Sequence, residues 1–119
     1  MSERIQWIQH GGKEILYSDY SEVSEAQYLT LVDEMEGELL KKPQGSNLLI
    51  LINVKDSNMT PATRDRGKQT SAVVQEAGIT SLTAVVGISG VQRIIVQAIS
   101  KDTYFAKDIG SAKDWLVSQ

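Results

Sequence analysis

Two different spacings of apolar residues run through this chain, and they predict which segments are strands and which are helices. Residues 48–52 form a continuous apolar run, and Val54 follows two positions later. A run without a polar face is typical of a central strand that helices cover on both sides of a sheet. Segments 5–9 and 14–20 alternate between apolar and polar residues, so they predict two further strands, joined as a hairpin by a two-glycine turn.

After this hairpin, apolar residues recur at helical spacing. Ser24 and Gln27 form an S-x-x-Q capping box, which satisfies free amides at the start of a helix. The apolar residues that follow are Tyr28, Leu31, Val32, Met35 and Leu39. Their spacing of three and four places them in one stripe, which we expect to face the sheet. Pro43 and Gly45 end this helix.

The remaining chain repeats the order of strand and helix. Thr60 begins a helix over residues 61–77, because threonine caps a free amide and the proline after it lacks an N–H that would have no partner there. A largely apolar strand at 82–88 leads into a third helix. The apolar stripe of that helix comprises Val91, Ile94, Ile95, Ala98 and Ile99. Residues 103–106 predict a short last strand, and Asp108 caps a closing helix.

The resulting order, ββαβαβαβα, predicts an α/β domain with a mostly parallel central sheet, an N-terminal hairpin and packed helices. Right-handed crossovers bring the starts of three helices to one edge of the sheet, near residues 21–24, 59–61 and 89–90. In open α/β sheets, ligands and partners usually bind at the carboxyl ends of the strands. We therefore expect the working surface of the protein at residues 55–63.

The first half of the helix over 61–77 differs from the others, because residues 64–69 are polar almost all round. Such a stretch is either a solvated face, as charge runs on helices usually are, or part of a binding surface. On the binding interpretation, replacing Arg64 and Arg66 by glutamate is predicted to leave thermal stability nearly unchanged while weakening the capture of a protein partner.

Composition narrows the function classes. The 119 residues fit one domain. The absence of cysteine excludes disulfides and cysteine chemistry, and a chain without cysteine is compatible with a reducing cytoplasm. A formal net charge of −3 offers no basic surface for a phosphate backbone, so nucleic acid is not an expected partner. No apolar run approaches the roughly 20 residues of a membrane span, and the start lacks a signal-peptide core. We expect a cytoplasmic protein.

The sequence contains no catalytic signature, and we expect neither an enzyme nor a cofactor or metal site. Its one histidine, His10, precedes two glycines and is interpreted as a turn residue. Residues 67–70 lack the first glycine of a phosphate-binding P-loop. Residues 56–58 begin like a calcium loop, but the later ligands do not follow, so turn chemistry explains them better.

Four segments, which together extend over nearly the whole chain, are KEILYSDYS, LLILINVKD, AVVGISGVQRIIVQAIS and AKDWLVS. In this order they resemble the SpoIIAA-like family of small bacterial proteins. The family is related to the STAS domain (sulfate transporter and anti-sigma factor antagonist) and is similar in shape to the CRAL-TRIO lipid-transfer fold. The resemblance implies one STAS-like domain over residues 1–119. It also implies a non-enzymatic regulatory module that binds a protein partner.

In STAS anti-sigma antagonists, phosphorylation of a serine at the start of the helix after the central strand switches partner binding. This chain has Met-Thr-Pro-Ala-Thr at the corresponding residues 59–63, without that serine. Ser57, Thr60 and Thr63 are the nearby hydroxyls. The predicted partner-binding or switch residues are Asp56, Ser57, Asn58, Thr60, Thr63, Arg64, Arg66 and Ser89.

The likeness to lipid-carrier shapes implies an alternative function, in which the protein carries or senses a small apolar ligand held between helices and sheet. The residues predicted to line such a site are Met59, Val73, Val91, Ile94, Ile95 and Tyr104. Ordinary core packing explains the same residues without a ligand. A homodimer is a further option, since sheet edges and helix faces offer contact surfaces.

Overall fold

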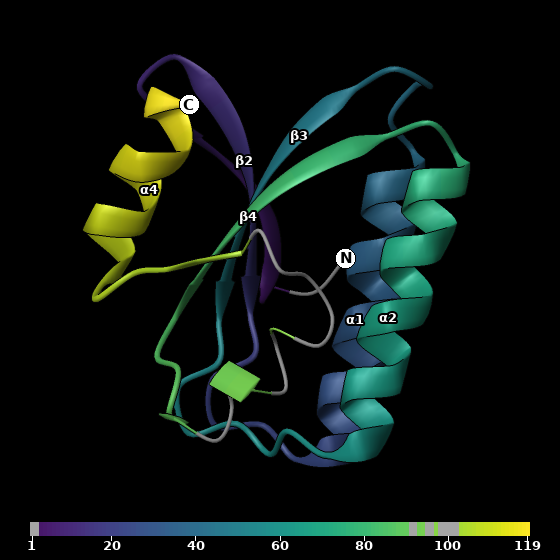
Figure 1. Ribbon diagram of the computed structural model, residues 1–119, viewed down its shortest axis with the longest axis vertical. Helices are drawn as coiled ribbons and strands as arrows, with labels where there is room; N and C mark the ends of the chain where they lie inside the picture. The colour runs from purple at the N-terminus through teal and green to yellow at the C-terminus, as the bar shows by residue number, and fades with distance from the viewer. Residues whose placement is uncertain (1–2, 91–92, 95–96, 98–102) are drawn as a thin grey trace.

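The computed structural model describes residues 3–90, 93–94, 97 and 103–119. Within these residues, five strands form one sheet and three helices pack on it (Figure 1). The strands are β1 (Ile5–His10), β2 (Lys13–Asp19), β3 (Asn47–Asn53), β4 (Thr80–Val86) and β5 (Tyr104–Phe105). The helices are α1 (Glu25–Leu40), α2 (Pro61–Glu76) and α4 (Ile109–Ser118).

The sheet is mixed, with the strands in the order β1-β2-β3-β4-β5. β1 and β2 pair antiparallel across the glycine turn, whereas the other neighbouring strands pair in parallel. Helices α1 and α2 lie side by side on one face of the sheet, and α4 lies on the other (Figure 1). The predicted α/β fold, its N-terminal hairpin and the central place of β3 are confirmed.

Alternating residues of the central strands enter two separate apolar layers. Leu16 and Ile50 face α1 and α2, whereas Ile15 and Leu51 face α4, and all four are buried. The apolar stripe predicted for α1 is buried in the first of these layers. The uninterrupted apolar run in β3 is therefore explained by helices on both faces of the sheet.

The three described helices begin with the caps that the sequence predicts. The Ser24 side chain accepts a hydrogen bond from the backbone N–H of Gln27, and Gln27 completes the capping box. Thr60 caps α2 with Pro61 at the first position of the helix, and Asp108 caps α4. These caps satisfy amides that have no partner within the helix, so local sequence sets where each helix starts.

Some predicted boundaries are wrong by one or two residues. β4 runs from Thr80 to Val86 instead of over 82–88, because its pairing with β3 begins at Asn47 and Thr80. The short last strand comprises only Tyr104 and Phe105. The predicted third helix, with its apolar stripe of Val91, Ile94, Ile95, Ala98 and Ile99, falls largely outside the described residues.

A glycine at the end of β4 allows the loop that follows β3 to approach closely. Gly87 has a φ of +77°, and a Cβ atom there would lie 2.7 Å from the backbone N of Lys55. We expect Gly87→Ala to destabilise the fold through both the left-handed backbone and this clash. Gly12 is the matched control, because its φ is +79° and a Cβ atom added there would meet nothing within 4 Å.

Gly12→Ala is expected to lower the unfolding free energy by about 1–2 kcal/mol, because alanine is strained in the left-handed backbone conformation and meets no other obstacle there. Gly87→Ala should cost clearly more, because backbone atoms of Lys55 must also move. Urea denaturation of both variants measures the difference. Equal losses would show that the close approach of these two segments does not matter for stability.

Candidate functional site

The loops after β2 and β3 are bound to each other at the carboxyl edge of the sheet. Directly after β2, the backbone N–H of Tyr20 donates to the carbonyl of Asn53, the last residue of β3, at 2.8 Å. Glu22 N–H then donates to the Lys55 carbonyl at 2.9 Å, and Asn58 N–H donates to the Val23 carbonyl at 3.2 Å. The two loops therefore continue the contact between β2 and β3 and hold each other in place.

Each of these loops contains a residue other than glycine in the left-handed region. Glu22 has a φ of 57° and Asp56 a φ of 54°. Such residues are uncommon outside glycine and persist only where the surrounding structure holds them, often at functional sites. The hydrogen bond from Glu22 N–H to the Lys55 carbonyl links the two left-handed residues, because Lys55 directly precedes Asp56. The exposed side chains of Glu22, Lys55, Asp56 and Asn58 form what we term the edge surface.

The predicted switch hydroxyls are not equally accessible. Thr63 is only 2% exposed, and its hydroxyl accepts from Thr60 N–H at 2.8 Å while donating to the Thr60 carbonyl at 2.9 Å. Thr63 thus serves the helix cap and is not a surface hydroxyl, contrary to its predicted place in the switch loop. Ser57 is half-buried and donates to the Val54 carbonyl at 2.8 Å, whereas Ser89 is exposed.

The two predicted arginines of α2 have different environments. Arg64 forms an ion pair only with the adjacent Asp65 among the described residues; the Arg64 side chain is 37% exposed and that of Asp65 is 67% exposed. Arg66 reaches across to α1, where it lies 2.8 Å from Asp33 Oδ1 and 3.0 Å from Glu36 Oε1. Thr70 joins this network, since its hydroxyl accepts from Arg66 and donates to Glu36 at 3.0 Å.

The network corrects three predictions from the sequence. The polar half of α2 is not simply solvated, because Arg66 and the buried Thr70 pack against α1. Arg66 is occupied by carboxylates of its own chain, so it does not fit the role of a free partner-binding cation. For the same reason, a replacement of Arg66 is not expected to leave stability unchanged. The hydrogen bonds from Arg66, followed by that from Thr70, lower the pKa of Glu36.

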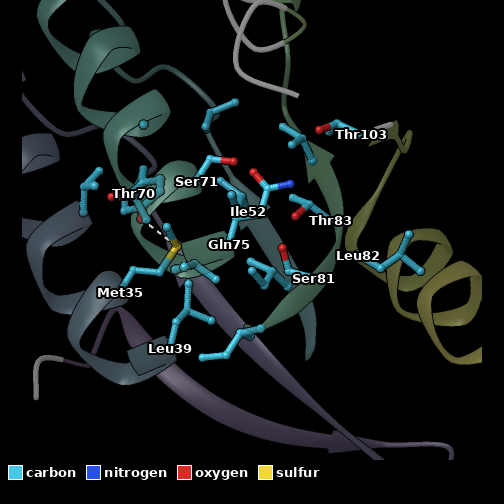
Figure 2. A pocket seen from close by; sticks show the side chains of 18 of the residues that line it. Met35, Leu39, Ile52, Thr70, Ser71, Gln75, Ser81, Leu82, Thr83 and Thr103 are labelled. Carbon is cyan, nitrogen blue, oxygen red and sulfur yellow. Dashed lines mark hydrogen bonds between the residues drawn. The ribbon is translucent and has the colours of Figure 1, made fainter. Parts of the chain in front are cut away.

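A pocket of about 330 Å³ lies between the two helices and the sheet (Figure 2). Its apolar floor includes Val32, Met35, Leu39, Ile50, Ile52 and Val74. The polar side chains of Ser71 and Gln75, from α2, lie opposite Ser81 and Thr83, from β4 (Figure 2). The pocket therefore combines an apolar interior with a polar rim.

The residues predicted to line an apolar site are not those that line this pocket. Met59, Val73, Ile94 and Tyr104 are described but do not contribute to it, and Ile94 is 71% exposed. Val91 and Ile95 lie outside the described residues. One signal in the sequence pointed to the true lining. Ser81 and Thr83 are polar residues at alternate positions of a strand that is otherwise largely apolar.

Two tyrosines form the end of the pocket nearest α1. The rings of Tyr20 and Tyr28 stack with their centres 4.5 Å apart, and the Tyr20 hydroxyl donates to Met35 Sδ at 3.2 Å. Burial raises the pKa of both phenols above its ordinary value. Both tyrosines are therefore neutral at physiological pH and bring no charge into the pocket.

The described part of the chain contains no cluster of His, Asp or Glu suited to hold a metal ion. His10 ends β1, and its Nε2 lies 2.9 Å from Asp114 Oδ1 of α4, so it links the hairpin to the last helix. Among the described helices, none is both long and apolar enough to cross a bilayer.

Comparison with known proteins found no matching family model, no similar curated protein and no similar solved structure. The relation to SpoIIAA-like and STAS proteins therefore stays a prediction based on the four sequence segments.

The α1–α2 network predicts unequal effects of two arginine substitutions. Arg66→Gln should lower the unfolding free energy by about 1–3 kcal/mol, because it leaves Glu36 and Asp33 without their cation. The side chains of Arg66 and Glu36 are only 19% and 20% exposed, which places the pair between surface and buried cases. Arg64→Gln, the matched control, should change stability by less than about 0.5 kcal/mol. Similar losses in urea denaturation would contradict the network.

The lowered pKa of Glu36 adds a pH dependence. In the unfolded chain this carboxyl has its ordinary pKa, so the stability gained from its ionised form is complete above that value. The gain is lost as the pH falls through the lowered pKa of the folded state. The stability difference between wild type and Arg66→Gln should be constant near neutrality and shrink in acid below about 4.3. A difference that stays constant in acid would mean that Glu36 does not contribute through its charge.

Proposed function

We propose that this protein is a non-enzymatic regulatory module that binds a protein partner through the edge surface. The observation that supports this function most is the pair of mutually bonded loops, with Glu22 and Asp56 held in left-handed conformations. Strained residues of this kind need a reason, and the presentation of side chains in a fixed geometry is one. The edge surface is also at the carboxyl ends of parallel strands, where α/β sheets usually bind partners.

The rigidity of the edge surface favours binding. Backbone hydrogen bonds fix both loops before any partner arrives, so little conformational entropy remains to be lost on association. Side-chain bonds add to this order, since Asn53 Oδ1 accepts from Lys55 N–H at 3.1 Å and Asp19 Oδ1 accepts from Ser21 N–H at 2.9 Å. A partner would therefore meet a preformed arrangement.

The charges of the edge surface indicate what kind of contact it makes. Glu22 and Asp56 are acidic, Lys55 is basic, and Asn58 can both donate and accept hydrogen bonds. A surface of mixed charge recognises a partner through complementary charges, which affect specificity and association rate more than affinity. Helix α2 begins just after the loop that contains Asp56 and Asn58, and the Arg66 network fixes this helix to α1.

Site-specific photo-crosslinking tests this proposal. A photoreactive residue in place of Lys55 should give a covalent adduct with one defined protein when the cells that make this chain are irradiated. The control is the same residue in place of Lys13, which is also exposed but begins β2 at the opposite edge of the sheet. Mass spectrometry identifies the adduct, and an adduct of twice the chain mass would identify a second copy as the partner.

Neutralising the edge surface should then reduce that adduct. Glu22→Gln with Asp56→Asn removes two charges, and asparagine tolerates the left-handed region as aspartate does. Stability should change by less than about 0.5 kcal/mol, while the yield of the Lys55 adduct falls several-fold. Glu76→Gln with Asp114→Asn removes two exposed charges elsewhere and should leave the yield unchanged. Equal adducts at Lys55 and Lys13, or none at Lys55, would refute the proposed surface.

A further inference from the structure

The pocket between the α1–α2 layer and the sheet has a second property that bears on function: among the described residues, none that lines it is charged. The ion pairs of Arg66 with Glu36 and Asp33 lie beside the pocket residue Thr70, and these charged groups satisfy one another. Tyr20 and Tyr28, at the same end, are neutral phenols because burial raises the pKa of each. The described lining therefore offers no counter-ion to a charged ligand.

The rim of the pocket offers hydrogen bonds instead. Ser71 and Gln75 point from α2 toward Ser81 and Thr83 of β4 (Figure 2). Within the described part of the chain, none of these four side chains makes a hydrogen bond, in contrast to Thr63 and Thr70 deeper in the pocket. Two hydroxyls from the strand and a hydroxyl and an amide from the helix are thus available to a bound molecule.

The strand pattern shows that this rim belongs to one face of β4. Leu82 and Ala84 enter the apolar layer with α4, whereas Ser81, Thr83 and Val85 face the pocket. A sheet face covered by helices normally has apolar residues at such positions. The hydroxyls of Ser81 and Thr83 are unnecessary for packing, but they suit a molecule with a polar end.

We propose that this pocket binds a neutral, mainly apolar small molecule that has one hydrogen-bonding group, such as a hydroxyl. The apolar part would lie on the floor near Met35, Leu39 and Ile52, and the polar group would meet the rim. A volume of about 330 Å³ is within the range of small-molecule sites. A fatty-acid anion is disfavoured by the same geometry, because a carboxylate without a cation is costly to bury.

This inference is independent of the proposed function, because the pocket and the edge surface share no residue. A ligand could bind here whether or not a protein binds at the loops. The pocket is therefore tested with small molecules alone, and the Lys55 adduct serves as a separate measurement. If n-octanol fails to bind but the Lys55 adduct forms, only the pocket proposal fails. If the adduct is absent but n-octanol binds, only the proposed partner surface fails.

Titration with n-octanol and with octanoate, which have the same chain length, tests the proposal on the purified full chain. Amide chemical shifts in NMR report both affinity and position. We expect n-octanol to shift Ser71, Gln75 and Thr83, and octanoate to bind at least tenfold more weakly. Equal binding of both probes, or shifts away from the pocket, would overturn the proposal. Absence of n-octanol binding, as when the chain's own side chains fill the space, would overturn it too.

Substitutions at Thr83 distinguish the effect of filling the pocket from the effect of removing a hydroxyl at its rim. Thr83→Phe should fill the pocket and abolish n-octanol binding, while Gln6→Phe, at an exposed position of β1, should leave it unchanged. Thr83→Val keeps the shape but removes the hydroxyl, so the affinity for n-octanol should fall about threefold to tenfold. Urea denaturation confirms that each variant is folded. Unchanged affinity in Thr83→Phe would show that the molecule binds elsewhere.

Discussion

The structure depends on the burial of β3 on both faces. Leu51 is wholly buried on the side of α4, and Ile50 is nearly so on the side of α1 and α2. A strand without a polar face is stable only when helices cover the sheet twice. Parallel pairing of β3 with both β2 and β4 then requires crossover helices, and these bring the loops after β2 and β3 to the same edge.

The edge surface is a consequence of that parallel pairing. Because β2 and β3 run in the same direction, their following loops leave the sheet side by side and exchange backbone hydrogen bonds. Those bonds hold Glu22 and Asp56 in conformations that neither residue favours alone. The same edge includes the end of β4, where Gly87 is needed because the backbone of Lys55 passes so close. The ends of β2, β3 and β4 are thus held together by contacts between the segments that follow them.

The helix layer combines two kinds of contact that have different consequences. Apolar side chains of α1 bury against the sheet, while Arg66 fixes α2 to α1 through Asp33 and Glu36. Between α2 and β4 the layer is less tightly filled, and the pocket with its uncharged polar rim remains there. The proposed partner surface and the proposed small-molecule site share no residue, so the two proposals concern separate parts of the fold.

Local patterns in the sequence were sufficient for the described elements and their order, because capping and periodicity act over a few residues. Ser24, Thr60 and Asp108 start the helices as expected, and the apolar run of β3 indicates its central place. The sites were mostly not predictable. Arg66 meets carboxylates about thirty positions away, Glu22 is held by a neighbouring loop, and the pocket is formed by several elements. Only tertiary packing sets distances between segments that are remote in sequence, so only the folded structure decided which polar residues are engaged and which are available.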